Sequence, residues 1–146
     1  MKRFAALGLA LVLMAVAASC GGSDTSSNIV APAGTVATDT FTGTVGPPVA
    51  GVLQSDSHSF TVTVAGNISI TLVSAGPPST ITMGLGIGNP SSTGTCSLIS
   101  GGSTAAVASS TAQLSGSTAA GAYCVSVFDI GNVLQPITYT VTVAHT

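Results

Sequence analysis

The most constraining feature of this chain is a strict alternation of apolar and polar side chains. Near the C-terminus Ile137, Tyr139, Val141 and Val143 alternate with three threonines. Successive side chains of a β-strand point to opposite faces, so this period of two is typical of a strand with one buried face. The same pattern, weakest within residues 105–114, predicts further strands at residues 41–45, 59–64, 68–72, 81–87, 96–99, 105–114 and 123–128.

No segment after residue 20 has the apolar period of an amphipathic helix. Residues 105–112 come closest, but their serine, threonine and valine content disfavours a helix. The expected strands are separated by turn residues such as Pro47-Pro48, Pro77-Pro78 and Gly101-Gly102. About seven or eight short strands with one apolar face each predict an all-β fold, an antiparallel two-sheet β-sandwich. A closed β-barrel is the alternative.

The strands at residues 59–64 and 68–72 are expected to pair as a hairpin. Gly66 and Asn67 lie between them and tolerate the positive φ values that tight turns need. The alternation also predicts that Phe60, Tyr123 and Tyr139 point into the core.

Charged side chains are nearly absent from this sequence. The chain has two Lys or Arg residues, four Asp or Glu and two His among 146 residues. Both cations, Lys2 and Arg3, lie at the N-terminus. Nucleic-acid binding depends on Lys and Arg to neutralise phosphates, and sites for anionic substrates use the same side chains. Because residues 4–146 contain no Lys or Arg, we exclude nucleic-acid binding and recognition of anionic substrates by these side chains.

An apolar run from Phe4 to Ala18 follows these cations, which is the pattern of a secretory signal peptide. The run is too short for a transmembrane helix, which needs about 20 apolar residues. It ends in Ala17-Ala18-Ser19-Cys20, which resembles the lipobox of bacterial lipoproteins. The resemblance implies cleavage after Ser19 and acylation of Cys20 by a diacylglyceryl group and a further chain such as palmitate. An ordinary secretory signal or an uncleaved anchor is the alternative.

This interpretation divides the chain into a signal peptide at residues 1–19, a lipidated flexible tether at 20–36 and a β-sandwich domain at 37–146. Glycine and serine make up most of residues 21–27, a composition that behaves as a flexible coil. Several acyl chains hold a protein stably at a membrane. We therefore expect a lipid-anchored protein of the bacterial cell envelope that faces the periplasm or the cell exterior. Gly21, in place of the Asp that retains some enteric lipoproteins, slightly favours the outer membrane.

The body resembles a second known family through three segments. These are residues 59–66 (Ser-Phe-Thr-Val-Thr-Val-Ala-Gly), 120–127 (Ala-Gly-Ala-Tyr-Cys-Val-Ser-Val) and 139–143 (Tyr-Thr-Val-Thr-Val). In order and spacing they resemble the bacterial pre-peptidase C-terminal domain, from Phe41 to His145. The resemblance implies a jelly-roll-like β-sandwich. It also implies an accessory role toward a secreted peptidase or export system, here supplied by another chain.

Lipidation of Cys20 leaves Cys96 and Cys124 as a pair. A pair of cysteines in an exported protein is expected to form a disulfide. The bridge would close a loop of about 29 residues and stabilise the fold by about 3.5 kcal/mol. Free thiols and metal ligation are the alternatives, but structural zinc takes four ligands. A catalytic thiol would need a basic neighbour, and none lies nearby in sequence.

Asp56, His58 and Ser59 come nearest to a reactive cluster. On an extended strand Asp56 and His58 share a face, so they could pair or hold a metal together. The simpler interpretation is a solvated pair at the start of a strand, and His145 is expected to be frayed or exposed. The chain has no Gly-x-Ser-x-Gly nucleophile motif and no Glu for a carboxylate pair. We expect no catalytic site, no metal and no cofactor.

The alternating glycines of residues 84–88 superficially resemble a nucleotide-binding loop. The third glycine of that motif is misplaced and no βαβ context surrounds it. Glycines at every second position instead indicate a strand whose outer face is closely approached by other backbone.

A last candidate is a face of outward-pointing threonines. Such a hydroxyl-bearing surface would suit a polysaccharide, ice or a protein partner, although threonine is also simply favoured in strands. The candidate binding residues are Thr61, Thr63, Thr138, Thr140 and Thr142. The sequence as a whole predicts a non-catalytic binding or structural module with an envelope protein or polysaccharide as partner.

Overall fold

The computed structural model describes residues 34–146, so the predictions for the signal peptide, for Cys20 and for most of the tether lie outside the described residues. Eight strands make up the fold: β1 (Ala37–Val45), β2 (Ser55–Val62), β3 (Gly66–Gly76), β4 (Thr82–Pro90), β5 (Cys96–Val107), β6 (Leu114–Thr118), β7 (Gly121–Phe128) and β8 (Ile137–His145). Within residues 34–146 no helix is long and apolar enough to cross a membrane.

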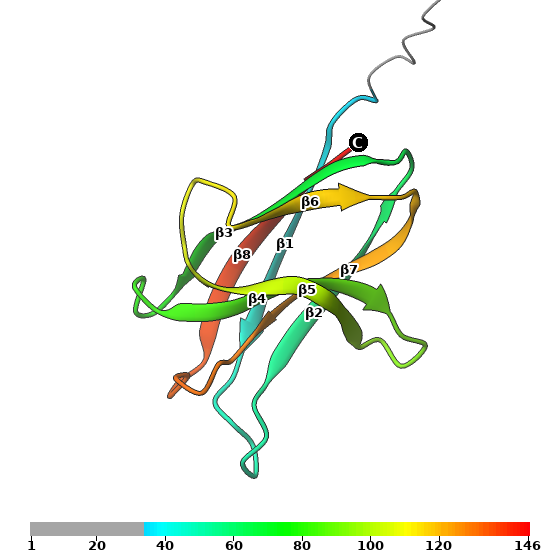
Figure 1. The fold of residues 1–146 in the computed structure, drawn as a ribbon. Coiled ribbons are helices and arrows are strands. Elements are labelled where there is room, and N and C mark those ends of the chain that lie inside the picture. Colours follow the sequence, from blue (N-terminus) through cyan, green and yellow to red (C-terminus); the bar gives the residue numbers. More distant parts are fainter. Residues whose placement is uncertain (1–33) are drawn as a thin grey trace, which may run out of the picture. The chain divides into compact units, whose positions relative to one another are not determined.

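The strands form two antiparallel four-stranded sheets, with orders β1-β8-β3-β6 and β2-β7-β4-β5. The sheets face each other as two layers (Figure 1). This arrangement confirms the predicted all-β two-sheet sandwich. The β1-β2 and β5-β6 pairs of edge strands lie at the two open sides, where the sheets come together without backbone pairing.

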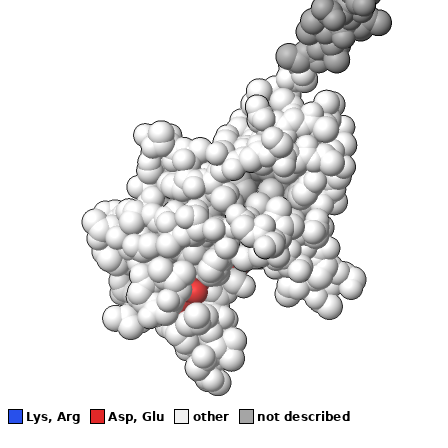
Figure 2. Space-filling view, viewed as in Figure 1, with Lys and Arg blue, Asp and Glu red and all other residues white. Residues whose placement is uncertain are grey.

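The surface of this body carries very little charge. Figure 2 shows one face on which the described residues are almost entirely uncharged, with acidic atoms visible in one small area. Among residues 34–146 the only charged residues other than histidine are Asp39, Asp56 and Asp129. Any partner of this surface is therefore recognised through shape, hydroxyl groups and apolar contact more than through ion pairs.

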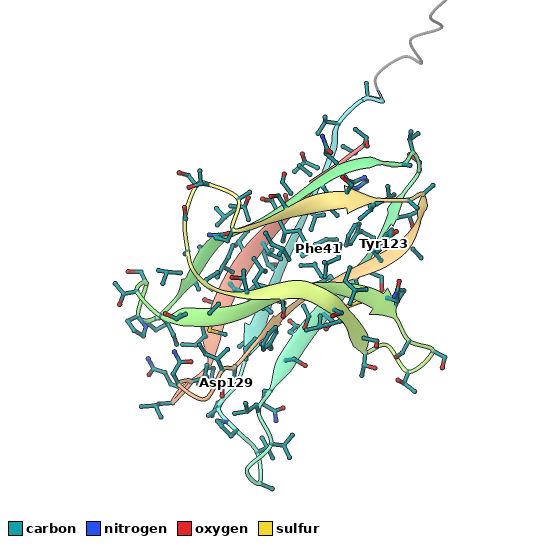
Figure 3. All side chains as sticks on the ribbon, viewed as in Figure 1. Phe41, Tyr123 and Asp129 are labelled. Atoms are coloured by element: carbon teal, nitrogen blue, oxygen red, sulfur yellow. A yellow bond between two sulfur atoms is a disulfide. The ribbon has the colours of Figure 1, made fainter. Side chains whose placement is uncertain are left out.

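The core lies between the sheets and follows from the alternation in sequence. Several inward-pointing side chains of β3, β4, β7 and β8 have no exposed surface, among them Leu72, Leu85, Val125 and Val141. Burial of such aliphatic side chains is the main stabilising contribution to a fold of this kind. Phe60 and Tyr139 are buried as predicted, and Tyr123 is partly buried against the core, between the sheets in Figure 3.

The predicted hairpin between residues 59–64 and 68–72 is wrong. β2 pairs with β7, whereas β3 pairs with β8 and β6 in the other sheet. Phe60 on β2 and Ile70 on β3 are both buried, because they enter the core from opposite layers. The exposed residues 63–65 therefore form an arch that crosses from one sheet to the other, which alternation alone does not distinguish from a hairpin.

β6 was not predicted, and the weak strand expected within residues 105–114 is mostly a loop. β6 has the sequence Leu-Ser-Gly-Ser-Thr, in which a single apolar residue gives no alternation. The loop before β6 is held to β3 by Gln113, whose side chain accepts from Leu72 N at 2.8 Å and donates to Val107 O at 3.0 Å. These bonds anchor residues 108–113 without a strand.

The outer face of β4 is closely approached at its glycines, but the expected approach by backbone is confirmed only at Gly88. A Cβ at Gly84 would overlap the ring of Phe128, and one at Gly88 would overlap the backbone of Ser97. At Gly86 a Cβ would come within 2.8 Å of the Leu98 side chain. Backbone makes the contact at Gly88, and side chains make it at the other two positions.

Candidate functional site: a seam of histidine and aspartate between the sheets

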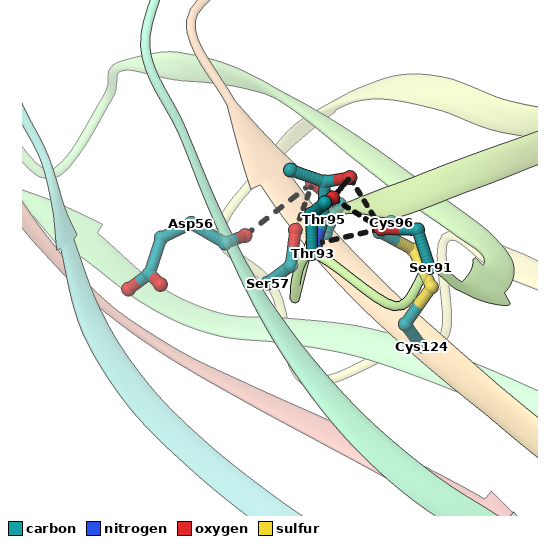
Figure 4. The surroundings of a disulfide bond; sticks show 8 residues. Asp56, Ser57, Ser91, Thr93, Thr95, Cys96 and Cys124 are labelled. Carbon is teal, nitrogen blue, oxygen red and sulfur yellow. Dashed lines mark hydrogen bonds between the residues drawn. A yellow bond between two sulfur atoms is a disulfide. The ribbon is translucent and has the colours of Figure 1, made fainter.

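The predicted disulfide is present and lies at one end of the β2-β7-β4-β5 sheet. Cys96 at the start of β5 is bonded to Cys124 in β7, with a Cα–Cα distance of 5.7 Å. Cys96 is opposite Pro90 and Cys124 is opposite Gly88, so the bridge passes over the end of β4. It therefore fastens the edge strand β5 to β7 across the strand between them (Figure 4).

Beside the disulfide, the turn between β4 and β5 is closed by its own hydroxyl groups. Ser91 Oγ lies 2.7 Å from Thr95 Oγ1 and 2.9 Å from Thr93 Oγ1. The amide of Ser91 also donates to Thr95 O at 2.8 Å. Because the three hydroxyls satisfy one another, this cluster has a structural role in the turn.

Asp56 and His58 do share a face of β2, as predicted, and a tyrosine from the opposite sheet joins them. The phenol of Tyr139 on β8 donates to Asp56 Oδ2 at 2.8 Å, and His58 Nε2 lies 2.9 Å from the same phenolic oxygen. His58 Nε2 and Asp56 Oδ2 are 3.8 Å apart. Because the phenolic O–H donates its hydrogen bond to Asp56, the Nε2–H of His58 donates to the phenolic oxygen. The pair is therefore partly buried and structurally engaged, and the simple solvated pair expected from sequence is wrong.

The environment of Tyr139 strongly favours its neutral form. Only 2% of this residue is exposed. Burial raises the pKa of the phenol well above its usual range, and the hydrogen bond to Asp56 and the charge of that carboxylate raise it further. Tyr139 is thereby kept as a permanent hydrogen-bond donor to Asp56.

Two residues of β1 complete this cluster. Gly43 lies opposite Tyr139, and a Cβ there would overlap both the Asp56 carboxylate and the phenol. The Phe41 ring stacks on the His58 imidazole with centroids 4.9 Å apart and an interplanar angle of 8°. Gly43 therefore provides the space for the carboxylate, and Phe41 covers the histidine.

His145 is buried, so the prediction that it is frayed or exposed is wrong. Only 5% of it is accessible, and its Nε2 lies 3.0 Å from Asp39 Oδ2. β8 is an inner strand that pairs with β1 and β3 as far as His145, so the residue is held on both sides. The ring of Phe60 lies 5.7 Å from its imidazole, centroid to centroid.

The two histidine–aspartate pairs thus lie along one side of the sandwich, where β1 and β2 meet. We call this region the seam; it consists of Asp39, Phe41, Asp56, His58, Tyr139 and His145. A groove of about 380 Å³ opens over part of it, lined by Asp39, Phe41, Phe60 and His145 among others.

The seam lacks the arrangement of a catalytic triad. Among the described residues neither histidine is hydrogen-bonded to a serine or threonine hydroxyl. Ser57 donates to Ser126 Oγ at 3.1 Å, and Ser59 is exposed. Residues 34–146 also contain no group of three or more His, Cys, Asp or Glu side chains that could hold a metal. In this geometry the contacts of Tyr139 with Asp56 and His58 link the two sheets, whereas Asp39–His145 joins β1 to β8 within one sheet.

The five candidate threonines do not form one face. Thr61 lies on β2 and Thr63 just beyond it, whereas Thr138, Thr140 and Thr142 lie on β8 in the other sheet. The β8 threonines belong to a larger array, since Thr142 has Thr40 and Thr71 as its neighbours across the strands. Thr140 likewise has Thr42 and Ser74 beside it. The outer face of β1-β8-β3 is therefore a sheet of hydroxyl groups.

Sequence reasoning missed several members of these sites. The threonines of β1 alternate at residues 38, 40, 42 and 44, and this signal was readable in sequence. The partners Asp39–His145 and Asp56–Tyr139 are far apart in the chain, and only the strand order brings them together.

A scan against protein-family models finds no match for the chain, and a search of curated proteins finds none either.

Proposed function

We propose that this protein is a lipid-anchored protein of the bacterial cell envelope whose β-sandwich serves as a non-catalytic binding or structural module. In this proposal Cys20 carries the acyl chains, residues 20–36 act as the tether, and the body stands outside the cytoplasm. The observation that carries the proposal is the Cys96–Cys124 disulfide. It uses two of the three cysteines and leaves the third at the end of an apolar N-terminal run.

The chemistry of the body supports a role without catalysis. The histidines of the seam are each occupied by an aspartate or tyrosine partner, and the nearby serines are engaged elsewhere or point outward. Disulfides persist in oxidising compartments, which agrees with export. Outer-membrane residence is the favoured location, with the body facing the periplasm or the exterior.

The anchor is tested by changing Cys20 to Ser in the full chain and fractionating the cells. The proposal expects most of the protein to leave the membrane fraction while Cys96 and Cys124 stay bonded. The matched control is Cys96→Ser with Cys124→Ser, which removes the bridge and should leave the protein in the membrane fraction. Membrane association that survives Cys20→Ser in full would contradict lipidation at this residue.

The partner of the module is proposed to meet the hydroxyl face of β1-β8-β3. This face is an ordered, uncharged surface, so it suits an uncharged envelope polysaccharide or a polar protein surface. Thr140→Val and Thr142→Val keep the shape and the strand preference while removing the hydroxyl groups. Sedimentation with envelope polysaccharide should be reduced by these changes and unaffected by Thr61→Val on the other sheet. Equal sedimentation of all three variants would contradict this assignment.

A second candidate function is an accessory role toward a secreted peptidase or export system. The specific support is the likeness to the pre-peptidase C-terminal domain together with the two-sheet sandwich and its buried Phe60 and Tyr139. Cross-linking in the envelope followed by identification of the partner distinguishes the two, because a recovered peptidase would favour the accessory role.

A further inference from the structure

One end of the sandwich carries an exposed apolar surface that the proposed anchor does not explain. We call it the distal tip and define it by five exposed aliphatic side chains of two loops: Val49, Val52 and Leu53 between β1 and β2, and Ile130 and Leu134 between β7 and β8. Leu134 is 91% exposed and Val49 is 65% exposed. In Figure 1 the β1-β2 loop projects from the lower end of the body, with the orange β7-β8 loop at the same end.

The loops at this end are fastened to one another, so the tip is a built surface. The amide of Asp129 donates to Gln54 O at 2.9 Å and ties the β7-β8 loop to the base of the β1-β2 loop. Gln135 Nε2 donates to Pro77 O at 3.1 Å and ties it to the β3-β4 loop. Asp129 itself is 1% exposed, and its Oδ1 accepts from the amides of residues 131, 132 and 133. Figure 3 places Asp129 where these loops meet.

The β1-β2 loop is unusual in its composition and in its backbone. Residues 46–53 contain no polar side chain, in a chain rich in serine and threonine. Val49 and Val52 exchange two backbone hydrogen bonds of 3.0 and 2.9 Å around Ala50 and Gly51. Both turn residues have positive φ, 50° and 81°, as in a type I′ hairpin turn. The loop is thus a preformed finger with an apolar surface.

We propose that the distal tip inserts into the apolar layer of a lipid bilayer. Each backbone N–H or C=O without an internal partner opposes entry into lipid, and the finger has fewer such groups than an open loop of the same length. Val49 and Val52 satisfy each other in the finger, and the two prolines before them have no N–H to satisfy. The tip exposes no charged side chain, so its insertion carries no cost of removing a charge from water.

Two further observations favour a bilayer over a second copy of this chain. A stable interface between proteins takes about 800 Å² and 20–30 residues from each partner, far more than five side chains provide. A bilayer, in contrast, receives a convex apolar tip without needing a complementary shape. Because the described body has no Lys or Arg, the insertion does not depend on anionic lipid.

The length of chain between the anchor and the body is compatible with this contact. Residue 34 lies at the end opposite the tip, next to Thr146 and Val64. From Gly34 through the nine-residue strand β1 to Val49 in the finger, the chain spans at most about 50 Å. Fully extended, the segment from Cys20 to Gly34 spans at most about 50 Å. The tether is therefore long enough for the tip and the anchor to meet the same membrane, and in this respect the inference rests on the proposed function.

The test uses the absence of tryptophan from the chain. Val52→Trp places a single fluorescent reporter on the finger, and Val73→Trp places a control on an exposed position of β3. Each full-length acylated protein is reconstituted in phosphatidylcholine vesicles, with and without brominated lipid. We expect a blue shift and quenching by the brominated lipid for Val52→Trp, neither for the control, and the same result when anionic lipid is added.

A further variant separates lipid insertion from other causes of burial. Adding Val49→Ser and Leu134→Ser to the reporter protein should abolish the shift and the quenching. An unshifted Val52→Trp spectrum would overturn the proposal, and a blue shift without quenching would assign the tip to contact with protein. Mass spectrometry of the same samples shows separately whether Cys20 carries acyl chains. Cys20→Ser protein mixed with the brominated vesicles should still show quenching, at a lower level, so failure of the anchor and failure of the tip are distinguishable.

Discussion

The phenolic oxygen of Tyr139 on β8 lies 2.8 Å from the carboxylate of Asp56 on β2, and this hydrogen bond helps to link the two sheets at the β1-β2 side of the sandwich. The two residues are 83 positions apart in sequence. Tyr139 is buried and Asp56 is partly exposed, so solvent reaches the acceptor of this hydrogen bond but not its donor. The hydrogen bond should therefore affect both the pKa of Tyr139, which titration measures, and the free energy of unfolding, which mutation tests.

Tyr139 should remain protonated in the folded protein at a pH at which a free phenol ionises. An unperturbed phenol has a pKa of about 10, and burial raises the pKa of Tyr139 above this value. The folded state therefore binds this proton more tightly than the unfolded state. Its stabilising contribution is complete below pH 10 and declines as the pH rises further. Ultraviolet titration should show one of the two tyrosines ionising only together with unfolding, and Tyr139→Phe should remove that step.

A second prediction concerns the charge of Asp56. Asp56→Asn keeps the hydrogen-bond acceptor but removes the negative charge, so the pKa of Tyr139 should fall from its raised value while burial keeps it above the usual range. In the same ultraviolet titration the step in which Tyr139 ionises together with unfolding should then occur at a lower pH. An unchanged titration in Asp56→Asn would show that the carboxylate does not act on the phenol.

Tyr139→Phe should also lower the free energy of unfolding by about 1–3 kcal/mol, because it leaves both Asp56 and His58 without their buried partner. Tyr123→Phe is the matched control. Its hydroxyl donates to Ala119 O at an exposed site, where water can replace it. Urea denaturation of the two variants makes the comparison, and equal losses would contradict a structural role for the seam.

Gly88→Ala should destabilise the sheet by about 2 kcal/mol or more, since a methyl group there would overlap the backbone of Ser97, which cannot move as a side chain can. Gly116→Ala on the edge strand β6 is the control, because a Cβ there meets nothing within 4 Å. Thermal unfolding should give a large loss for the first variant and little change for the second. A tolerated Gly88→Ala would contradict the close approach of β5 to β4.

Reduction of the Cys96–Cys124 bridge should lower the free energy of unfolding by about 3.5 kcal/mol, the value expected for a closed loop with a sequence separation of 28. The double variant Cys96→Ser with Cys124→Ser should show the same loss without reductant. The difference is measured by urea denaturation with and without a reducing agent. A reductant effect that persists in the double variant would assign the loss to another cause.

The fold class was predictable because each inner strand carries its own alternation, and the burial of Ile137, Tyr139 and Val141 follows directly from it. The pairing of strands was not, because β2 and β3 have the same alternation whether they form a hairpin or an arch between sheets. β6 gave no signal, since Leu114 is its only apolar side chain. Local pattern fixes which face of a strand is buried but leaves the order of strands open.

The site residues were likewise predictable where they depend on local sequence and not where they depend on strand order. The disulfide was predicted from the number of cysteines and the expected compartment, and neither needs three-dimensional information. Only Asp56 and His58 of the seam were predicted as a pair, because they lie close together on one strand. The contact with Tyr139 and the Asp39–His145 pair depend on the order of strands. His145 was placed wrongly for the same reason: its position in the chain suggested an end, whereas β8 lies inside a sheet.

Intact-mass analysis of the protein purified from its native membrane tests the central claim most directly. The account predicts a chain that begins at Cys20, carries acyl mass on that residue, and takes up no alkylating agent at Cys96 or Cys124 until it is reduced. A chain without acyl mass, or one in which Cys96 and Cys124 are alkylated before reduction, would contradict it.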